Sequence, residues 1–447
     1  MFLLLLACTP ETSKNPGGDD SAAVGDAPTW YQDVAPIVVE NCAGCHNPSG
    51  PGFDLSDYAH ASPMAGAMAN ATSAGRMPPW GAKEDENCAP TTPWKDDRRL
   101  SEAQIATLAA WAEAGAPEGN ADSAAPTNDP KTVGLEDYDL ELGPVEPYFT
   151  QGDTDELICF SIDPHASSWA LLSGIEVVPG NQSIAHHALV FADPTGASAD
   201  LAGADGWYDC GSGSGVNVPQ ARLLATWVPG APPTRAPEGT AIPFEAGARV
   251  LVQMHYHPAG KVGEEDETLL RVKLAEGIPT AALYQTLVGN FFTEGMGLEP
   301  GPNDRWGAEF RIPANVAGHT ETMTYVVPNG VQDLPLVSFG AHMHLAGVSL
   351  SVKLDKGSGD QCLLNVPAYD YDWQQLYDYD AGLDDVPTVS SGDVVTVQCT
   401  YDNTLDNPGV QRALAEYGYD EPQDIYLGEG TMDEMCLAMV GFVYQVR

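Results

Sequence analysis

From about Leu135 to the end, the chain alternates short β-rich runs with turns rich in Gly, Pro and Asp. Strands at this spacing, with few helical patterns between them, are typical of antiparallel sandwiches. Some 310 residues are too many for one ordinary sandwich, so we predict two jelly-roll-like sandwich domains, residues 135–285 and 286–447. The runs that we expect to be strands are 157–162, 169–178, 188–191, 249–256, 268–274, 323–327, 348–354, 394–400 and 440–446.

The region before the sandwiches has a different texture, and we predict a small all-α domain over residues 29–119. A helix-like run from Trp30 to Glu40 leads into the sequence CAGCH, in which Cys42 and Cys45 precede His46. CxxCH is the c-type haem attachment pattern, with two thiols for the haem vinyl groups and a histidine for the iron. A zinc half-site is the alternative. Together with a methionine loop and a C-terminal helix, this region resembles a class I cytochrome c.

The second axial haem ligand that we expect is Met77, because Pro78 and Pro79 would hold its loop extended. The competing candidates are Met64, Met68 and His60. The domain's last helix has a clear start, since Ser101 and Gln104 match a capping box. Gly115 is its expected C-terminal stop. Residues 120–134 then form a linker.

The first eight residues, MFLLLLAC, look like the end of a bacterial lipoprotein signal, with Cys8 as the lipidated residue. Residues 9–28 read as a flexible tether. The sequence thus predicts a lipid anchor at Cys8 and an extracytoplasmic, periplasmic-side or secreted location. Nine cysteines are present, and six remain after Cys8, Cys42 and Cys45 are set aside. An even remainder in an exported chain suggests disulfides, of undetermined connectivity.

Charge excludes one class of function. The net charge is −44, with 63 acidic and 19 basic residues. Nucleic-acid binding needs a basic footprint, so we expect no nucleic-acid partner. The same acidity disfavours adhesion to anionic membranes.

Six of the ten histidines form three tight clusters, at positions 186/187, 255/257 and 342/344. His342 and His344 are two apart in a run with strand character, so their side chains leave the same face. His186 and His187 are adjacent, and neighbours on an ideal strand point to opposite faces. Both can bind one ion only at a bulge or a strand end. Scattered core histidines would not cluster, so the pattern predicts metal binding, with zinc still possible.

Beyond the clusters, several blocks together resemble the copper- and ascorbate-dependent monooxygenases, the family of peptidylglycine α-hydroxylating monooxygenase and dopamine β-monooxygenase. The blocks occur in order over roughly 135–447 and read LICF (157–160), HH (186–187), GWYDC (206–210), ATW (225–227), APPTR (231–235), VQMHY (252–256), HMHLAG (342–347), CTY (399–401) and DEMC (433–436).

The resemblance implies two copper ions. By position, one has the ligands His186, His187 and His255 and transfers electrons; the other has His342, His344 and Met435 and is the catalytic, oxygen-binding copper. Two imidazoles and a thioether suit copper, because soft sulfur favours the cuprous state. The resemblance also implies one copper per sandwich across a solvent-filled cleft.

The resemblance implies two disulfides, Cys159–Cys210 and Cys399–Cys436. It leaves Cys88 and Cys362 unassigned, and His257 without a role.

The chain departs from the family at the substrate site. Peptide-amidating members hold a carboxylate with an arginine, an asparagine and a tyrosine, and the corresponding positions here are Gly340, Leu437 and Met439. An apolar pocket cannot pair a buried carboxylate, so we expect a small neutral or apolar substrate.

The implied reaction inserts one oxygen atom of O2 into a substrate C–H bond. The electron donor would be external, ascorbate-like or a redox protein, and our hypothesis is that the covalently attached haem c relays the electrons to the first copper. Two alternatives stay open: a non-enzymatic copper and haem electron-transfer protein, and a zinc hydrolase with a haem appendage. The resemblance would place Gln253 near the path between the two coppers, but an ordinary polar strand residue explains it equally well.

Overall fold

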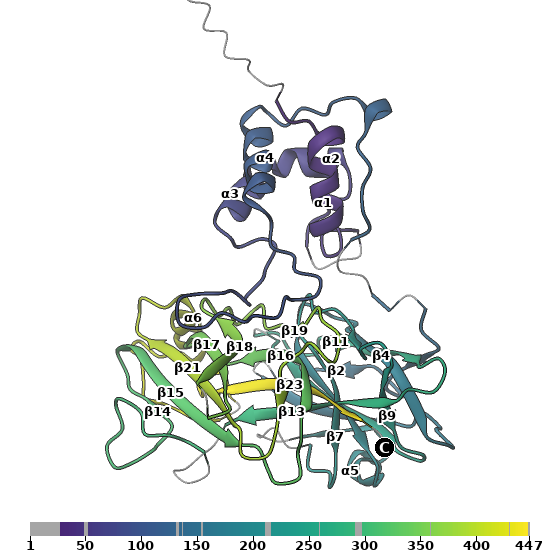
Figure 1. The fold of residues 1–447 in the computed structure, drawn as a ribbon, viewed down its shortest axis with the longest axis vertical. Coiled ribbons are helices and arrows are strands. Elements are labelled where there is room, and N and C mark those ends of the chain that lie inside the picture. Colours follow the sequence, from purple (N-terminus) through teal and green to yellow (C-terminus); the bar gives the residue numbers. More distant parts are fainter. Residues whose placement is uncertain are drawn as a thin grey trace, which may run out of the picture.

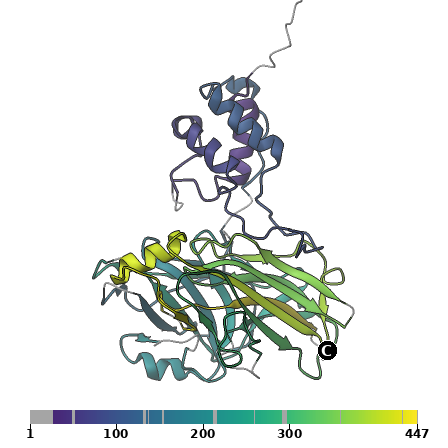
Figure 2. The same cartoon turned by 90° about the vertical axis from the view of Figure 1, so that its left-hand side faces the viewer.

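The computed structural model describes residues 27–48, 52–130, 134–135, 137–152, 155–210, 216–258, 260–290, 297–357, 359–428 and 430–445. Cys8, where we predict a lipid anchor, and almost all of the tether 9–28 lie outside the described residues. Figures 1 and 2 show short helices gathered at one end of the molecule and layered sheets at the other. Among the described residues, no helix is both long enough and apolar enough to cross a bilayer.

The helices near the N-terminus are short, with α4 the longest at 12 residues. Ser101 and Gln104 form the predicted capping box, and Gly115 adopts the positive φ of 82° expected after the helix end. Trp30 and Trp111 pack together in a small core of their own. The elements are a π-helical turn at Trp30–Val34, α1 Ala35–Asn41, α2 Tyr58–Ala61, a 3-10 turn at Ser62–Met64, α3 Ala65–Ser73, α4 Glu102–Glu113 and a 3-10 turn at Ala121–Ser123.

The predicted all-α, cytochrome c-like domain over 29–119 is wrong as a description of this region. Residues 77–99, which we call the strap, contain no helix and run against the sheets. Trp80 and Trp94 of the strap are buried in the main core among strand residues. The strap pairs with the sheets through an isolated bridge between Trp94 and Tyr379. Four prolines in the strap prevent a helix, and its two tryptophans bury their area against strands instead.

All nine runs that the sequence predicts to be strands are strands in the structure. The first set of bounds is β1 Leu140–Leu142, β2 Tyr148–Phe149, β3 Glu156–Ile162, β4 Ala170–Val178, β5 Ala185–Asp193, β6 Trp207–Asp209, β7 Arg222–Trp227, β8 Thr234–Arg235, β9 Thr240–Phe244, β10 Arg249–Tyr256, β11 Glu265–Asp266 and β12 Leu269–Leu274. The second set is β13 Ala281–Gly289, β14 Arg311–Ile312, β15 Val316–Val326, β16 Leu334–His342, β17 Gly347–Asp355, β18 Asp360–Val366, β19 Leu376–Asp378, β20 Thr388–Val389, β21 Val394–Asn403, β22 Ile425–Tyr426 and β23 Leu437–Gln445. Two further helices are α5 Ala197–Ala202 and α6 Pro408–Tyr417.

The prediction of two separate sandwiches is also corrected, because one sheet runs through both halves of the chain. Its ten strands include the path β1-β12-β4-β9-β13-β23-β16-β19, and β13 crosses the predicted boundary at 285. β13 pairs in parallel with β9 and antiparallel with β23. Ile242, Leu283 and Val443 from these three strands therefore share one continuous core. The fold is a β-rich, multi-sheet structure with few short helices.

Two smaller antiparallel sheets accompany the large one. The five-stranded sheet has the order β6-β3-β10-β5-β7, and the four-stranded sheet has the order β15-β21-β17-β18. Two-stranded pairs β2–β11 and β14–β22 complete the pattern. The five-stranded sheet places β10 in its centre beside β5, and the large sheet places β16 beside β23. These two strand pairs carry the histidine clusters.

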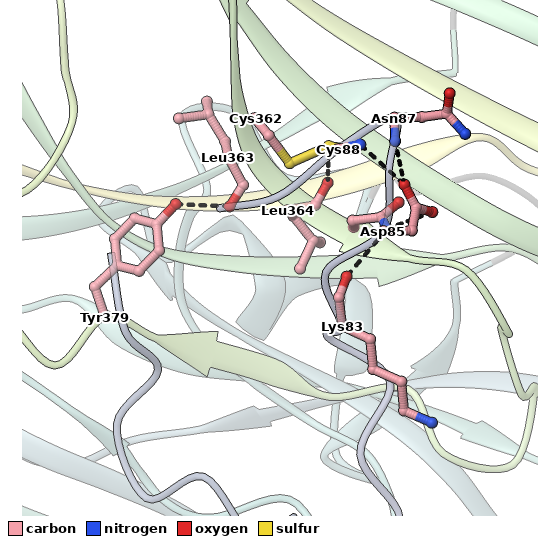
Figure 3. The surroundings of a disulfide bond; sticks show 9 residues. Lys83, Asp85, Asn87, Cys88, Cys362, Leu363, Leu364 and Tyr379 are labelled. Carbon is pink, nitrogen blue, oxygen red and sulfur yellow. Dashed lines mark hydrogen bonds between the residues drawn. A yellow bond between two sulfur atoms is a disulfide. The ribbon is translucent and has the colours of Figure 1, made fainter. Parts of the chain in front are cut away.

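Three disulfides cross-link the fold. Cys159–Cys210 and Cys399–Cys436 form as the resemblance implies, and Cys88 pairs with Cys362 across 274 residues. Figure 3 shows the last of these joining the strap to β18. Disulfides of this kind persist in oxidising compartments, which is consistent with the expected extracytoplasmic location.

Candidate metal centre

His186, His187 and His255 come together on two neighbouring strands. In the β5–β10 ladder, His255 pairs with His187 and the next residue, Tyr256, pairs with Ala185. His186 is therefore the extra residue of a β-bulge, the arrangement that the sequence required if both adjacent histidines were to reach one point. The Nδ1 atoms of His186 and His187 are 3.0 Å apart. Ligand nitrogens of all three histidines lie within 4.8 Å of one another, so they could hold one ion.

His342 and His344 converge at the end of β16. His342 is the last residue of the strand, and His344 lies in the connection to β17; their ring centroids are 5.4 Å apart. The Nδ1–H of His344 donates to the carbonyl of Asp433 (2.9 Å), and His342 Nδ1 contacts Oε1 of Gln374 (2.5 Å). With Nδ1 occupied in each ring, Nε2 is the nitrogen left for a metal.

Met435 is buried, and it belongs to the segment 433–436, which hydrogen-bonds to His344. The carboxylate of Glu434 accepts from the backbone N–H groups of His344 (2.7 Å) and Met435 (3.1 Å). On the other side, the Tyr401 hydroxyl donates to the Met435 carbonyl at 2.7 Å. Cys436, the next residue, is bonded to Cys399. The Met435 backbone is thus fixed beside His344 by a carboxylate, a phenol and a disulfide.

The two sets of ligands adjoin each other directly. The rings of His187 and His342 are 5.5 Å apart between centroids, in an edge-to-face arrangement. The expectation of one ion in each sandwich, separated by a solvent-filled cleft, is therefore wrong for this structure. The physical reason is the continuous core between the two halves, which brings the end of β16 against β5 and β10.

Burial keeps these imidazoles neutral. It lowers the pKa of His344 to about 3 and of His342 to about 4, and it holds the pKa values of His186 and His187 well below the usual range. Metals bind neutral imidazole, so no proton needs to leave these rings at neutral pH. The neutral state also removes repulsion among these four closely packed rings.

Asp155 connects this centre to His257. Its carboxylate lies 3.6 Å from His255 Nε2 and 2.6 Å from His257 Nδ1, and it also accepts from the Thr431 hydroxyl. Burial acts to raise the pKa of Asp155, but the hydrogen bonds from the two histidines outweigh it and hold that pKa far below the usual range. His257 Nε2 also approaches Glu416 at 3.7 Å. His257, Asp155 and Glu416 thus form an ion-pair cluster beside the centre. One nitrogen or oxygen atom of each of these residues lies within 4.8 Å of those of the other two.

A short segment after β18 touches both sets of histidines. The Tyr371 ring stacks on His186 with centroids 4.3 Å apart, and Gln374 contacts His342. The Arg412 guanidinium lies over the Tyr371 ring, 5.2 Å from its centroid, and pairs with Asp372 at 3.1 Å. A cavity of about 800 Å³ adjoins Tyr371 and Gln374.

The CxxCH residues line a separate cavity of about 450 Å³, and Met77 lines the same cavity. His46 Nδ1 contacts the carbonyl of Phe53 at 2.9 Å, which leaves Nε2 as the free nitrogen. Burial is the main cause that raises the pKa of the Cys42 thiol to about 12. Two thiols, an imidazole and a thioether around one mainly apolar cavity are residues that could hold a haem. Among the competing ligands, Met68 also lines this cavity.

The substrate-site departures lie together. Gly340 pairs with Met439 between β16 and β23, and Leu437 pairs with His342. A Cβ at Gly340 would approach the Met439 methyl to 2.5 Å. Met439 thus occupies the space beside Gly340, so a large side chain at position 340 would collide with it.

Sequence reasoning missed four residues that contact the proposed ligands: Asp155, Tyr371, Gln374 and Glu434. Glu434 was within reach, because it lies inside the DEMC block next to Met435. Along the chain, Gln374 is 32 residues from His342, Asp155 is 102 residues from His257, and Tyr371 is farther still from His186, so no spacing rule links them. Gln253, in β10, is buried and its Nε2 has no hydrogen-bond partner among the described residues.

Comparisons with known proteins do not assign this chain to a family. No family model matches the chain, and no curated protein matches it. Among solved structures, the major capsid protein P2 of bacteriophage PM2 is similar at 9% identity and a TM-score of 0.29, covering 69% of this chain and 98% of that one. PNGase F, a glycosylasparaginase from Flavobacterium meningosepticum, is similar at 10% identity and a TM-score of 0.20, covering 68% and 94%. Likenesses this weak support no statement about the function of this chain.

Proposed function

We propose that this protein is a copper-dependent monooxygenase that hydroxylates a C–H bond of a small organic substrate, and that it resembles the peptidylglycine α-hydroxylating and dopamine β-monooxygenase family. The observation that carries the proposal is the convergence of five histidines, with the backbone of Met435 fixed beside His344. Nitrogen ligands together with a thioether match the preference of copper among the common metals. Zinc sites use imidazole, thiolate and carboxylate instead.

In this proposal each ligand set has a distinct part. His186, His187 and His255 hold an all-nitrogen copper, and His342, His344 and Met435 hold the second, whose thioether favours the reduced ion. Copper bound in these sites supplies one-electron redox chemistry. The net reaction consumes one O2, two electrons and two protons, and it yields one hydroxylated product and one water. Gln374 orients the imidazole of His342, and Asp433 orients that of His344. Glu434 holds the backbone of His344 and Met435.

Cys42, Cys45, His46 and Met77 would hold one covalently attached haem c, whose chemistry is one-electron transfer. One-electron transfer between an external donor, ascorbate-like or a redox protein, and the histidines is the chemistry that a haem held by these residues would supply. Trp373 lines the haem cavity, and the next residue, Gln374, contacts His342. The closeness of these two residues in the chain supports this arrangement.

The substrate in this proposal is neutral or apolar. Met439 fills the space at Gly340, and Arg412 is already paired with Asp372. A substrate carboxylate would therefore lose its hydration near the histidines without gaining a cation. The finer location, a membrane lipoprotein anchored through Cys8 on the periplasmic side, belongs to the same proposal.

The test is metal analysis combined with oxygen consumption. The full chain is matured in a bacterial periplasm, and copper, zinc and iron are counted per chain. We expect two coppers and one iron, and oxygen uptake that requires a reductant and is stimulated by substrate. Zinc in the histidine sites would favour the hydrolase alternative. Two coppers without any substrate-dependent oxygen uptake, across a broad panel of neutral compounds, would favour the electron-transfer alternative.

A further inference from the structure

The cavity of about 800 Å³ beside the histidines has walls from parts of the chain that are far apart in sequence. Its lining comes from within residues 71–83, the end of α3 and the start of the strap, and from within residues 341–347, 366–377 and 407–412. Tyr371 and Gln374 are lining residues that also contact His186 and His342. The volume lies within the range of pockets that enclose small organic ligands, ~300–1,000 Å³.

The strap wall is held firmly against the sheets. The Gly81 N–H donates to the Tyr377 hydroxyl at 2.9 Å, and the Trp80 ring packs edge-on against Tyr377 at 5.0 Å. Farther along the strap, Lys83 and Asn365 exchange backbone and side-chain hydrogen bonds of 2.9 and 3.0 Å. The Cys88–Cys362 disulfide closes this region, as Figure 3 shows. The wall is therefore a built part of the β-rich body.

Aromatic rings form part of the interior of the cavity. Five aromatic side chains line it, from Trp80, Tyr369, Tyr371, Trp373 and Tyr377. Aromatic faces and edges pack well against a flat ligand, and such pairs add ~0.5–1.5 kcal/mol to area burial in proteins. An aliphatic ligand would gain the burial but not this geometric preference.

The charges of the lining also select among ligands. Arg412 and Asp372, which lie against Tyr371, pair with each other at 3.1 Å. The exposed Arg76 and Asp370 and the half-buried Lys83 also line the cavity. Beside Tyr371, the lining thus offers stacking surface and a neutralised ion pair.

We propose that this cavity binds a neutral, planar aromatic molecule and that residues 71–83 are part of the substrate site. The inference rests on the proposed function for calling that molecule a substrate. It assigns to the region after the CxxCH motif a second role, separate from haem attachment. The segment that the family resemblance does not cover would then set which substrate enters.

The test is calorimetric binding of 2-naphthol to the full-length, haem-containing protein, first with copper removed by a chelator and then with copper loaded. Ala74→Trp fills the cavity from the end of α3, where residue 74 is exposed and lines it. Ser73→Trp, one residue earlier and outside the lining, is the matched control. We expect one saturable site, at least tenfold weaker binding in Ala74→Trp, and less than a twofold change in Ser73→Trp. The anion 2-naphthoate should bind at least tenfold more weakly than 2-naphthol.

Absence of saturable binding, an equal effect of both variants, or tighter binding of 2-naphthoate would overturn the proposal. Binding to the copper-free protein measures the cavity alone. If the chain takes up no copper but Ala74→Trp still blocks 2-naphthol, the monooxygenase proposal fails and the cavity stands. If copper loads and oxygen uptake responds to some substrate while Ala74→Trp leaves 2-naphthol binding unchanged, the cavity proposal alone fails.

Discussion

The two histidine sets differ in what holds their rings. His342 and His344 each have Nδ1 engaged by an oxygen of the protein, from Gln374 and Asp433. In the other set, the Nδ1 atoms of His186 and His187 face each other at 3.0 Å. One set is therefore oriented by oxygen acceptors of the protein. In the other set two imidazoles hydrogen-bond to each other, and the Tyr371 ring stacks on one of them.

The two sets also differ in the polar groups that hold the surrounding backbone in place. Around His344, one buried carboxylate accepts four backbone N–H groups, from His344, Ala346, Gly347 and Met435. Around the other set, the bulge in β5 orients His186 and His187, and Asp155 is the nearby carboxylate. A strand bulge is local and encoded in a few residues, whereas the Glu434 network needs two distant segments.

The largest effect should come from removing a ligand in each set. His187→Ala and His344→Ala should each lower the copper content from two ions per chain to one, because each removes an imidazole from a different set. Metal analysis after dialysis against a weak chelator measures this. His165→Ala, at an exposed histidine outside both sets, should keep two ions. Loss of both ions in either single variant would show that the sets form one inseparable centre.

Next in size is the loss of the buried carboxylate. Glu434→Leu leaves four backbone N–H groups without their acceptor and should lower the free energy of unfolding by about 3–5 kcal/mol. Urea unfolding of the copper-free protein measures it. Burial raises the pKa of Glu434 to about 8. Glu434→Gln keeps one of the two acceptor oxygens, so it should cost less than Glu434→Leu. Equal losses in both variants would mean that charge, and not the acceptor oxygens, stabilises this segment.

A smaller effect is expected from loosening one ring. Gln374→Leu removes the oxygen that orients His342, and it should weaken copper binding at the His342/His344 set by about 10–100-fold. Competition with a chromophoric chelator gives the affinity, and the copper EPR spectrum reports the change in geometry. Gln374→Glu keeps an acceptor oxygen and should restore most of the affinity. An unchanged spectrum in Gln374→Leu would contradict the orienting role.

The smallest effect concerns the strand that supports His342. β19 pairs with β16, and burial raises the pKa of Asp378 on β19 from 3.8 to about 6. A raised carboxyl pKa means that ionisation destabilises the fold, so wild-type stability should fall as pH rises from about 4 to about 6. Asp378→Asn should match the wild type below pH 4 and exceed it by about 1–2 kcal/mol above pH 7, after allowance for partial solvent screening. Denaturant unfolding at pH 4, 5, 6 and 7 measures the difference, and a constant gap across this range would contradict it.

Local patterns in the sequence were enough to predict strands and a helix cap. The nine strand positions follow from β-rich runs between turn residues, and the capping box at Ser101 follows from two residues three apart. For His186 and His187, strand geometry left a bulge or a strand end as the two ways to share one ion, and the structure has the bulge. Each of these depends on neighbours within about ten residues, for which chain order and spatial order agree.

The tertiary structure decided what lies next to what. The pairing of β9 with β13 joins the two predicted sandwiches, and the strap buries Trp80 and Trp94 against the sheets. Neither contact has a sequence period, because each depends on which apolar surfaces remain uncovered once the local elements have formed.

The same holds within the candidate centre. The histidine clusters, the CxxCH motif and the DEMC block were visible in the sequence by themselves, because ligand chemistry depends on residue type and short spacing. That His187 lies beside His342, and that Gln374 and Tyr371 complete their surroundings, required the folded chain. Burial in a continuous core brings these groups together, and burial is a property of the whole fold.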